Sequence, residues 1–325
     1  MLDSKKIKIL SIIGQRAALG TSLFDLEKNF DNLIVLSADT STSAGLDKFR
    51  KIKPQKYLEM GISEQNMISV AAGLSSEGFN VVTTTFSPFQ TLRCLEQIKV
   101  NISYMKFKIT MVGLASGVAL GNLGFTHCSI EDKGAILAVP GINVISPADG
   151  LETYKAIEEC LKSENSSYIR LTGTAPSPQI YEKDYKFEIG KAIKLYDEGY
   201  DVAILSCGSM VFNSLEAAKK LKIKGIKTSV FNFHSIRPLD KKILSDITND
   251  FKFIFTVEEH NVENGLGSVV ANEIINTSKN IEFTKLGVKH EYSKSGEYLD
   301  MLRWNNLDTD GIEKTILNIV NGKKI

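Results

Sequence analysis

The sequence has little of several features that would decide a function at once. Its 325 residues include four cysteines, Cys94, Cys128, Cys160 and Cys207, and no C-x-x-C pair, which argues against a zinc site and a disulfide framework. No stretch approaches the ~20 consecutive apolar residues of a membrane-spanning helix. The N-terminus lacks the apolar core and cleavage site of a signal peptide. We therefore expect a cytoplasmic protein with no membrane partner.

An excess of positive charge is missing as well. Lys and Arg number 39 against 38 Asp and Glu, a formal net charge of +1, whereas a nucleic-acid binder carries a basic excess on one face. We expect no nucleic-acid partner. The composition, 43% hydrophobic and 24% charged, is that of a globular protein. A chain of 325 residues suggests two domains.

Three motifs of common nucleotide and hydrolase sites are also absent. No G-x-G-x-x-G follows a predicted strand, and neither G-x-x-x-x-G-K-[ST] nor G-x-S-x-G occurs. These absences argue against a nicotinamide enzyme, a P-loop nucleotide enzyme and a hydrolase with a serine nucleophile elbow.

Apolar runs of strand length alternate along the chain with segments of helical spacing. The strand candidates are 33–37, 81–85, 108–113, 143–146, 202–206, 227–233 and 253–258, and the helix candidates are 64–76, 88–100, 150–162, 210–223 and 267–275. This alternation is typical of βαβ units, so we predict an α/β protein with two doubly wound, mostly parallel-sheet domains. Pro176 and Pro178 stand in the weakest helical stretch, 174–186. We predict the boundary there, between domains 1–180 and 181–325.

Open parallel sheets bind ligands beyond the carboxyl ends of their strands, and three segments in such places carry unusual residues. In the first, 57–74, Glu64 stands in the first turn of a helix whose other residues are mostly apolar or small. Such a glutamate can simply complement the positive end of the helix. Alternatively it binds a nitrogen of a ligand, because a carboxylate among apolar residues is costly without a partner.

The second and third segments add two aromatic rings and a histidine. Phe86 and Phe89 straddle a strand end and a helix start, and they fit either a place in the core or a stacking wall for a flat heterocycle. His127 lies in a loop after three glycines. A lone loop histidine is often a surface residue, but glycines let the backbone approach a ligand closely.

Taken together, these segments resemble the transketolase family. The motifs are G-I-x-E-Q-N-M, T-F-x-x-F-x-x-x-R-x-x-E-Q-I, G-x-T-H-x-x-I-E-D and V-I-S-P-A-D, followed by T-V-E-E-H and G-L-G-S. Each is weak alone, but jointly they are specific and cover nearly the whole chain. The chain is most similar to the C-terminal half of this thiamine diphosphate enzyme, its pyrimidine-binding and C-terminal domains. Within the family it resembles the split form, in which that half is a separate subunit.

The resemblance implies roles toward the cofactor for four residues. Glu64 matches the glutamate that bonds the N1′ nitrogen of the aminopyrimidine and so favours the imino tautomer that generates the ylide. Phe86 and Phe89 match the aromatic residues around that ring, and Asp39 matches an aspartate near the thiamine.

The resemblance also implies a substrate side. His127 matches a histidine at the reacting oxygens of the substrate, where it donates a hydrogen bond or moves a proton. Ser41 and Ser43 fall in the loop that faces the substrate, and Arg16 matches an arginine at its phosphate end. The implied reaction transfers a two-carbon unit from a ketose or 2-oxo acid donor to an aldehyde or ketone acceptor.

The other half of the family's cofactor site is not in this sequence. That half has a G-D-G followed by an asparagine, which hold Mg²⁺ on the diphosphate, and this chain has no G-D-G. The resemblance therefore implies thiamine diphosphate as cofactor, with Mg²⁺ (or Ca²⁺) bound by an N-terminal partner subunit in an α2β2 assembly. No metal ligand is assigned to this chain.

Three positions depart from the family pattern. Leu123 stands where an aspartate bonds a sugar hydroxyl, Ala115 where a second histidine is common, and Gly173 in the stretch where an arginine grips the sugar phosphate. Losing one charge-assisted contact costs about 1.5–3 kcal/mol. We therefore expect a non-standard sugar substrate rather than an ordinary pentose or hexose phosphate. Candidates are an unphosphorylated ketose, pyruvate as a donor, or a nucleotide-linked sugar as an acceptor.

Two other functions remain open. The beta subunit of a 2-oxo acid dehydrogenase-type complex shares the two-domain plan, although T-H-x-x-I-E-D favours the transketolase-like interpretation. A non-catalytic subunit that retains the fold is the other alternative. The presence of Glu64, Phe86, Phe89 and His127 argues against it.

Overall fold

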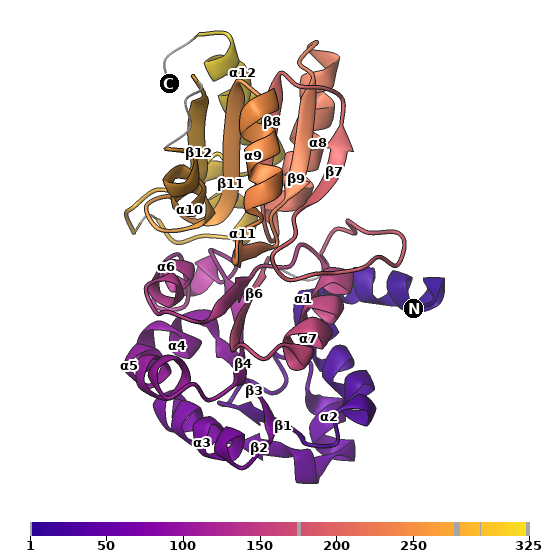
Figure 1. Cartoon of the computed structure of the whole chain (residues 1–325), viewed down its shortest axis with the longest axis vertical. Helices are drawn as coiled ribbons and strands as arrows, with labels where there is room; N and C mark the ends of the chain where they lie inside the picture. The colour runs from indigo at the N-terminus through magenta and orange to yellow at the C-terminus, as the bar shows by residue number, and fades with distance from the viewer. Residues whose placement is uncertain (1, 174–176, 276–279, 293, 323–325) are drawn as a thin grey trace.

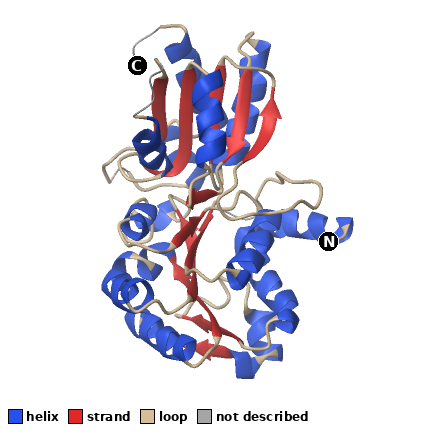
Figure 2. Ribbon diagram, viewed as in Figure 1, coloured by secondary structure: helices blue, strands red, loops and turns tan. Residues whose placement is uncertain are grey.

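The computed structural model describes residues 2–173, 177–275, 280–292 and 294–322. Two α/β domains lie one above the other, each built on its own sheet (Figure 1). Helices flank both sheets (Figure 2). Strands covered on both faces are expected to be largely apolar, as β1 and β8 are. The predicted class, two mostly parallel α/β sheets, is confirmed.

The first sheet has seven strands in the order β10-β5-β6-β4-β3-β1-β2. Every neighbouring pair is parallel except β10 and β5, which are antiparallel. The strands are β1 (Leu33–Ser37), β2 (Tyr57–Glu59), β3 (Asn80–Phe86), β4 (Ile109–Ser116), β5 (Asn143–Ile145), β6 (Ser167–Thr172) and β10 (Ser235–Arg237).

Helices cover the two faces of this sheet in separate groups. On one face, α1 (Ser4–Leu26), α2 (Asp47–Ile52) and α7 (Gly150–Lys162) pack into one hydrophobic cluster. On the other lie α3 (Glu64–Ser76), α6 (Asp132–Leu137) and the helical segment α4 (Ser87–Gln90), η3 (Leu92–Cys94), α5 (Leu95–Gln97) and η4 (Ile98–Tyr104). Successive strand residues alternate between the two clusters, as Val81 and Val82 do, because side chains in a strand point to opposite faces. Three short turns complete the domain, η1 (Glu27–Asn29), η2 (Pro54–Lys56) and η5 (Gly121–Leu123).

The second sheet has five strands in the order β12-β11-β8-β9-β7, of which only β7 is antiparallel to its neighbour. They are β7 (Ile193–Asp197), β8 (Val202–Ser206), β9 (Thr228–Asn232), β11 (Phe253–Asn261) and β12 (Glu282–Val288). The accompanying helices are α8 (Met210–Ile223), α9 (Lys241–Asp250), α10 (Leu266–Ile274), α11 (Tyr298–Trp304) and α12 (Thr309–Val320). Residues of α8 and α12 pack into one hydrophobic cluster and those of α9 and α10 into another, so the sheet is covered on both faces.

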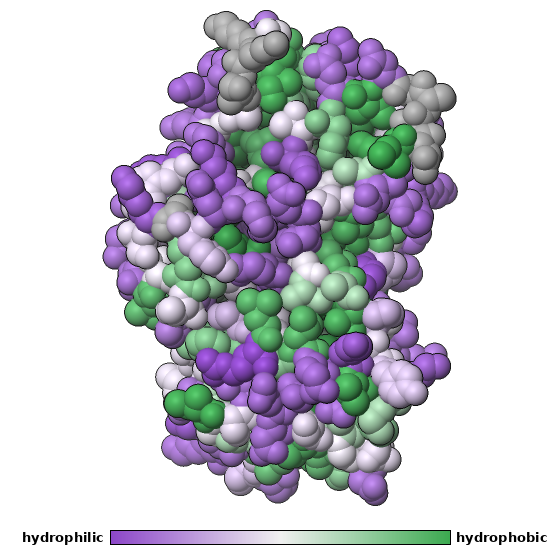
Figure 3. Space-filling view, turned by 90° about the vertical axis from the view of Figure 1, so that its left-hand side faces the viewer, coloured by the Kyte–Doolittle hydropathy of each residue, from purple (hydrophilic) through white to green (hydrophobic). Residues whose placement is uncertain are grey.

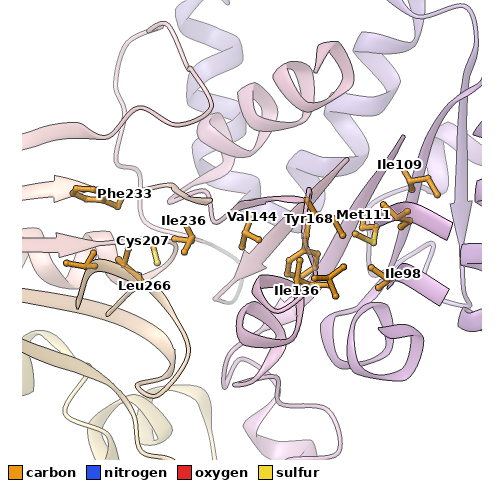
Figure 4. Close-up of a cluster of buried hydrophobic side chains, with 14 of the residues drawn as sticks. Ile98, Ile109, Met111, Ile136, Val144, Tyr168, Cys207, Phe233, Ile236 and Leu266 are labelled. Atoms are coloured by element: carbon orange, nitrogen blue, oxygen red, sulfur yellow. The ribbon is translucent and has the colours of Figure 1, made fainter. Parts of the chain in front are cut away.

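The two domains share a hydrophobic core. One cluster runs from Ile109 and Met111 in the first sheet through Val144 and Ile236 to Phe233 beside the second sheet (Figure 4). The strand β10 follows β9 along the chain but pairs with β5 in the first sheet. The second part of the chain therefore completes the sheet of the first domain.

The segment between β6 and β7 joins the domains. Its described residues, 173 and 177–192, form no helix or strand. The boundary at 180/181 falls within this segment and stays a prediction. Pro176 lies outside the described residues.

The surface is mixed in polarity. On the face shown in Figure 3, hydrophilic side chains occupy large areas of both domains, with smaller hydrophobic areas between them. Among the described helices, none is both long and apolar enough to cross a bilayer.

Candidate functional site

The candidate residues gather at the carboxyl edge of the first sheet. Asp39 follows β1, Phe86 ends β3, and His127 lies in the loop that follows β4. These three strands are neighbours in the order β4-β3-β1. Because parallel strands end at the same edge, loops far apart in the sequence meet here, which is the usual place for a ligand in an open parallel sheet.

Glu64 begins α3 and is almost fully buried, with 4% of its surface exposed. Its Oε1 accepts a hydrogen bond from Arg93 Nη1 at 2.7 Å. Its Oε2 has no hydrogen-bond partner within the described part of the chain. The carboxylate is thus held away from bulk water and has one oxygen to offer.

Phe86, Phe89 and His127 form one aromatic cluster beside this carboxylate. Ring centroids lie 6.4 Å apart for Phe86 and Phe89, 6.2 Å for Phe86 and His127 and 5.4 Å for Phe89 and His127. All three contacts are edge-on, and each ring keeps part of its surface exposed. In an edge-to-face pair the edge of one ring meets one face of the other, so the opposite face of that ring stays outside the contact. These three residues, which lie in two separate segments of the sequence, are therefore close together in the fold.

Arg93 connects the two parts of the site, although no role was predicted for it from sequence. Its guanidinium lies 3.9 Å from the centroid of the Phe89 ring and bonds Glu64. Its backbone carbonyl accepts a hydrogen bond from the side chain of Gln65 at 2.9 Å. The available signal was its place in the T-F-x-x-F-x-x-x-R motif, one helical turn beyond Phe89.

Asp39 lies at the same edge with its side chain exposed. Its backbone has a positive φ of 52°, and its N–H donates to Glu59 Oε1 at 2.8 Å. The same oxygen accepts from the N–H of Gly61, and Tyr57 donates to the other oxygen at 2.5 Å. Glu59, also missed from sequence, therefore ties the loop after β1 to the loop after β2.

The expected substrate loop is only partly open. Ser41 is buried and accepts a hydrogen bond from Arg50 Nη1 at 3.0 Å, whereas Ser43 is half-buried. Arg16 lies on α1 beyond a break at Gly14, which has a φ of 75°. Burial lowers the pKa of Arg16, and its guanidinium has no hydrogen-bond or ion-pair partner within the described ranges.

Tight packing brings Arg16 against that loop. A Cβ on Gly45 would lie 3.1 Å from the backbone oxygen of Arg16, and one on Gly20 would overlap the backbone oxygen of Gly45. Neither glycine has room for a side chain. The helix α1 and the loop that carries Ser41 and Ser43 are therefore locked together at this edge.

The three positions that depart from the family pattern occupy different settings. Leu123 is 53% exposed in η5, and Ala115 is buried near the end of β4 with a positive φ of 49°. Gly173 lies at the rim of a cavity of about 620 Å³ between the domains, together with Ser209 and Tyr298. None of the three supplies a polar side-chain group.

The two cysteines nearest the site do not act as nucleophiles in their present surroundings. Burial raises the pKa of both the Cys94 thiol and the Cys128 thiol to about 12. Both are therefore protonated at neutral pH, and only the thiolate reacts readily. No group of three or more His, Cys, Asp or Glu side chains in the described ranges is placed to hold a metal ion.

A second cluster of charged residues lies where the two domains meet. Asp132 Oδ2 accepts hydrogen bonds from Arg170 Nε and Tyr168 OH, both at 2.7 Å. Lys133 pairs with Glu258, whose carboxylate also accepts the N–H groups of Leu266 and Gly267. We call the charged residues and Tyr168, together with Glu259 and His260, the seam; its members are at most 1% exposed.

Inside the seam, burial shifts the pKa of two groups in opposite directions. Burial raises the pKa of Glu259, which accepts hydrogen bonds from Ser209, Tyr298 and the N–H of Val118. Burial also lowers the pKa of His260 well below its usual value, so its ring is neutral. This cluster is closed to solvent and holds the domains together.

Two known domain families match the chain over most of its length. Residues 13–175 match the transketolase pyrimidine binding domain, and residues 190–312 match the transketolase C-terminal domain.

Among curated proteins, a putative transketolase C-terminal section from Methanocaldococcus jannaschii is 32% identical, covering 94% of this chain and 95% of that protein. One of the subunits of apulose-4-phosphate transketolase from Phocaeicola vulgatus is 31% identical, covering 95% of this chain and 98% of that protein. A solved split-gene transketolase, described as an inactive β4 tetramer, superposes with a TM-score of 0.85 at 31% identity, covering 96% of this chain and 99% of that one.

Proposed function

The chain belongs to the transketolase family, and we propose that it is the C-terminal, pyrimidine-binding subunit of a thiamine diphosphate-dependent enzyme that transfers a two-carbon unit between sugars. One observation carries this proposal above all. A buried carboxylate, Glu64, has a free oxygen beside a cluster of partly exposed aromatic rings at the carboxyl edge of the sheet. Relatives named as transketolase subunits match it over nearly their whole length.

The residues present fit the pyrimidine end of thiamine diphosphate. An aminopyrimidine is a flat ring with nitrogens at its edge, and it needs aromatic walls and a hydrogen-bonding group that is shielded from water. Phe86 and Phe89 offer ring surface, and Glu64 offers a carboxylate oxygen without a partner among the described residues. Asp39 lies at the same edge, one strand away.

Each side chain then has a stated task. Glu64 would hold a proton at the ring nitrogen N1′, while Phe86 and Phe89 would flank the ring and exclude water from it. His127 would donate a hydrogen bond to the substrate oxygen that gains negative charge. When bound, the cofactor supplies the carbanion chemistry that receives and passes on the two-carbon unit.

A partner chain is the second part of the proposal. The sequence has no G-D-G motif for the diphosphate and its Mg²⁺. Large apolar side chains are exposed on the segments around the site, with Ile62 at 76%, Leu123 at 53%, Leu92 at 45% and Leu58 at 40%. Exposed apolar groups around a ligand site are typical of a surface that another chain covers. We propose an N-terminal subunit that holds the diphosphate and the metal, in an α2β2 assembly. A cytoplasmic location stays a prediction from sequence.

The substrate we propose is a non-standard sugar. Leu123, Ala115 and Gly173 remove polar contacts that the family pattern has for hydroxyl and phosphate groups. A relative with 31% identity is named for apulose 4-phosphate, which supports a substrate outside the ordinary pentose and hexose phosphates. Arg16, which is half-buried and unpaired within the described residues, is the remaining cation for a phosphate.

The experiment combines the chain with a candidate partner. The purified chain is assayed with and without the product of a neighbouring gene that carries G-D-G, in the presence of thiamine diphosphate and Mg²⁺. We expect turnover only with both chains, with xylulose 5-phosphate and ribose 5-phosphate poorer substrates than apulose 4-phosphate. Turnover by the chain alone would overturn the partner. Full activity with the two pentose phosphates would overturn the non-standard sugar, and oxidative decarboxylation of a 2-oxo acid would favour the dehydrogenase alternative.

A further inference from the structure

Arg93 is a side chain that touches both halves of the candidate site. Its guanidinium bonds Glu64 Oε1 at 2.7 Å and lies 3.9 Å from the centre of the Phe89 ring. It comes from η3, which Gln65 anchors to α3 through the hydrogen bond to the Arg93 carbonyl. The side chain of Arg93 is 40% exposed, whereas that of Glu64 is 4% exposed. Arg93 therefore lies on the solvent side of Glu64.

The geometry divides the two oxygens of Glu64 between two partners. A carboxylate accepts hydrogen bonds at both oxygens, and an ionised partner makes such bonds shorter and stronger. Arg93 occupies Oε1, and Oε2 is without a partner in the described structure. A ring nitrogen that carries a proton can donate it to Oε2, and this does not require Arg93 to leave.

The inference rests on the function proposed above and deepens it. We propose that Arg93 is a positioning residue, which fixes the Glu64 carboxylate in the orientation that presents Oε2 to N1′ of thiamine diphosphate. Stacking on Phe89 sets the guanidinium, and the guanidinium sets the carboxylate. Arg93 itself touches neither substrate nor the reacting atoms of the cofactor.

A separate chain has a particular need for this contact. A buried carboxylate without a partner is costly, and the cost falls on the empty chain before the cofactor and the second chain arrive. Arg93 gives Glu64 a partner in that state. The site is thereby formed in advance, so binding does not have to order the glutamate afterwards.

The first test uses the chain without cofactor. Urea unfolding is measured for the unmodified chain, Arg93→Gln, Glu64→Gln and the double variant. We expect Arg93→Gln to lower the midpoint of unfolding, and to lower it much less in the Glu64→Gln background, because the buried charge is then gone. Additive shifts would overturn the pairing. Lys99→Gln, which removes a charge on the following helical turn, is the matched control and should leave the midpoint unchanged.

The second test measures binding of thiamine diphosphate to the complex with the proposed N-terminal subunit. We expect Arg93→Gln to weaken binding about tenfold, the size of one charge-assisted contact at a partly exposed site. Arg93→Lys should recover part of the loss, since it keeps the charge but not the planar guanidinium. A pyridine analogue of the cofactor, which lacks N1′, should bind all variants alike because Oε2 then has nothing to bond.

The outcomes separate the two proposals. No binding of thiamine diphosphate by the unmodified complex would overturn the proposed function itself. Normal binding by the unmodified complex, with equal or tighter binding by Arg93→Gln, would overturn the positioning role alone, because Arg93 would then be neutral or a competitor. The same tenfold loss with the pyridine analogue would also overturn it, since the effect would not pass through Glu64.

Discussion

The site and the seam use the same kinds of charged residue in opposite ways. In the seam, Asp132, Lys133, Arg170 and Glu258 are at most 1% exposed, and each has one or more partners from the protein itself. At the site, Glu64 is nearly as buried, but its one hydrogen bond is to Arg93, whose side chain is 40% exposed. Asp132 also has one oxygen, Oδ1, without a hydrogen bond, but it is closed to solvent, whereas the free oxygen of Glu64 lies beside partly exposed rings at the edge of the sheet, where a ligand can reach it.

The same difference separates the residues within the family motifs into those of the site and those of the seam. T-H-x-x-I-E-D places His127 in the site and Asp132 in the seam, only five residues further on. T-V-E-E-H supplies Glu258, Glu259 and His260, all three of them in the seam. A motif interpreted as catalytic therefore contains residues whose task is to hold the two domains together. Burial and hydrogen-bond partners distinguish a residue that binds a ligand from one that holds the domains together, whereas the sequence motif alone does not.

The largest expected effect comes from the site. Glu64→Gln keeps the shape of the side chain but removes the carboxylate that handles the proton, so turnover of the complex should fall by about 10³-fold or more. The free energy of unfolding should change by no more than about 1 kcal/mol. The checks are steady-state kinetics with the proposed N-terminal subunit and urea unfolding of the chain. Glu96→Gln, an exposed carboxylate on the same helical segment as Arg93, is the control; near-normal activity of Glu64→Gln would reject the assignment.

In the seam, by contrast, a substitution should act mainly on the free energy of unfolding. Arg170→Met leaves Asp132 buried without its cation, which costs about 3–5 kcal/mol of unfolding free energy. The measurement is urea unfolding. Because the single variant can fail to fold, the double variant Arg170→Met with Asp132→Asn is made beside it, and it should recover a large part of the loss. Equal stability of the single variant and the unmodified chain would contradict a structural role for the seam.

A pH-dependent effect is expected where the chain passes between the domains. His234 is buried against Phe187, with ring centroids 4.2 Å apart, and burial lowers its pKa from 6.5 to about 3. The unfolded chain takes up a proton below pH 6.5 that the folded chain does not, so stability is present above that pH and is lost as the pH falls. The loss is about 1.4 kcal/mol per pH unit, or about 2 kcal/mol at pH 5. His234→Phe should remove this contribution.

The check for that prediction is urea unfolding of both proteins at pH 7.5 and pH 5. The difference between the two pH values should be about 2 kcal/mol smaller for the variant. An equal pH dependence in both would mean that His234 is protonated in the folded chain.

The smallest effect concerns specificity at the edge of the site. Leu123→Asp restores the carboxylate of the family pattern at a position that is 53% exposed and contributes little packing. We expect kcat/KM for xylulose 5-phosphate to rise about tenfold, the value of one hydrogen bond to a charged group, with stability changed by less than about 0.5 kcal/mol. Asn122→Asp adds the same charge one residue away and should have no such effect. A common rise in both variants would point to charge alone.

The sequence predicted the regular parts of the fold well and the irregular parts poorly. The helices Glu64–Ser76, Gly150–Lys162 and Met210–Ile223 have the expected bounds, because their apolar periodicity and end signals agree. The predicted helix 88–100 is instead broken into α4, η3, α5 and a π-helical turn. The break lies where Arg93 must reach back to Glu64, a contact that no local pattern encodes.

Strands with buried polar residues were missed. β6 carries Ser167, Arg170 and Thr172 and does not form an apolar run, yet all its residues are buried, because Arg170 finds its partners in other elements. β10 has only three residues and pairs with a strand about 90 positions earlier.

The site residues taken from the resemblance did gather at one edge, except that Ser41 is buried against Arg50. Arg93 was missed because its partner Glu64 lies on another segment, and Glu59 because its bond to the N–H of Asp39 joins two loops.

The crossing strand β10 also limits where such an enzyme can be cut in two. Ser235–Arg237 covers the outer edge of β5, and Arg237 donates hydrogen bonds to the carbonyls of Ile136, Leu137 and Ile142. A gene divided between these two domains would produce a first fragment with a bare sheet edge and three carbonyls stripped of their donor. A division between the two sheets is therefore disfavoured, because each fragment would expose polar groups whose partners lie on the other.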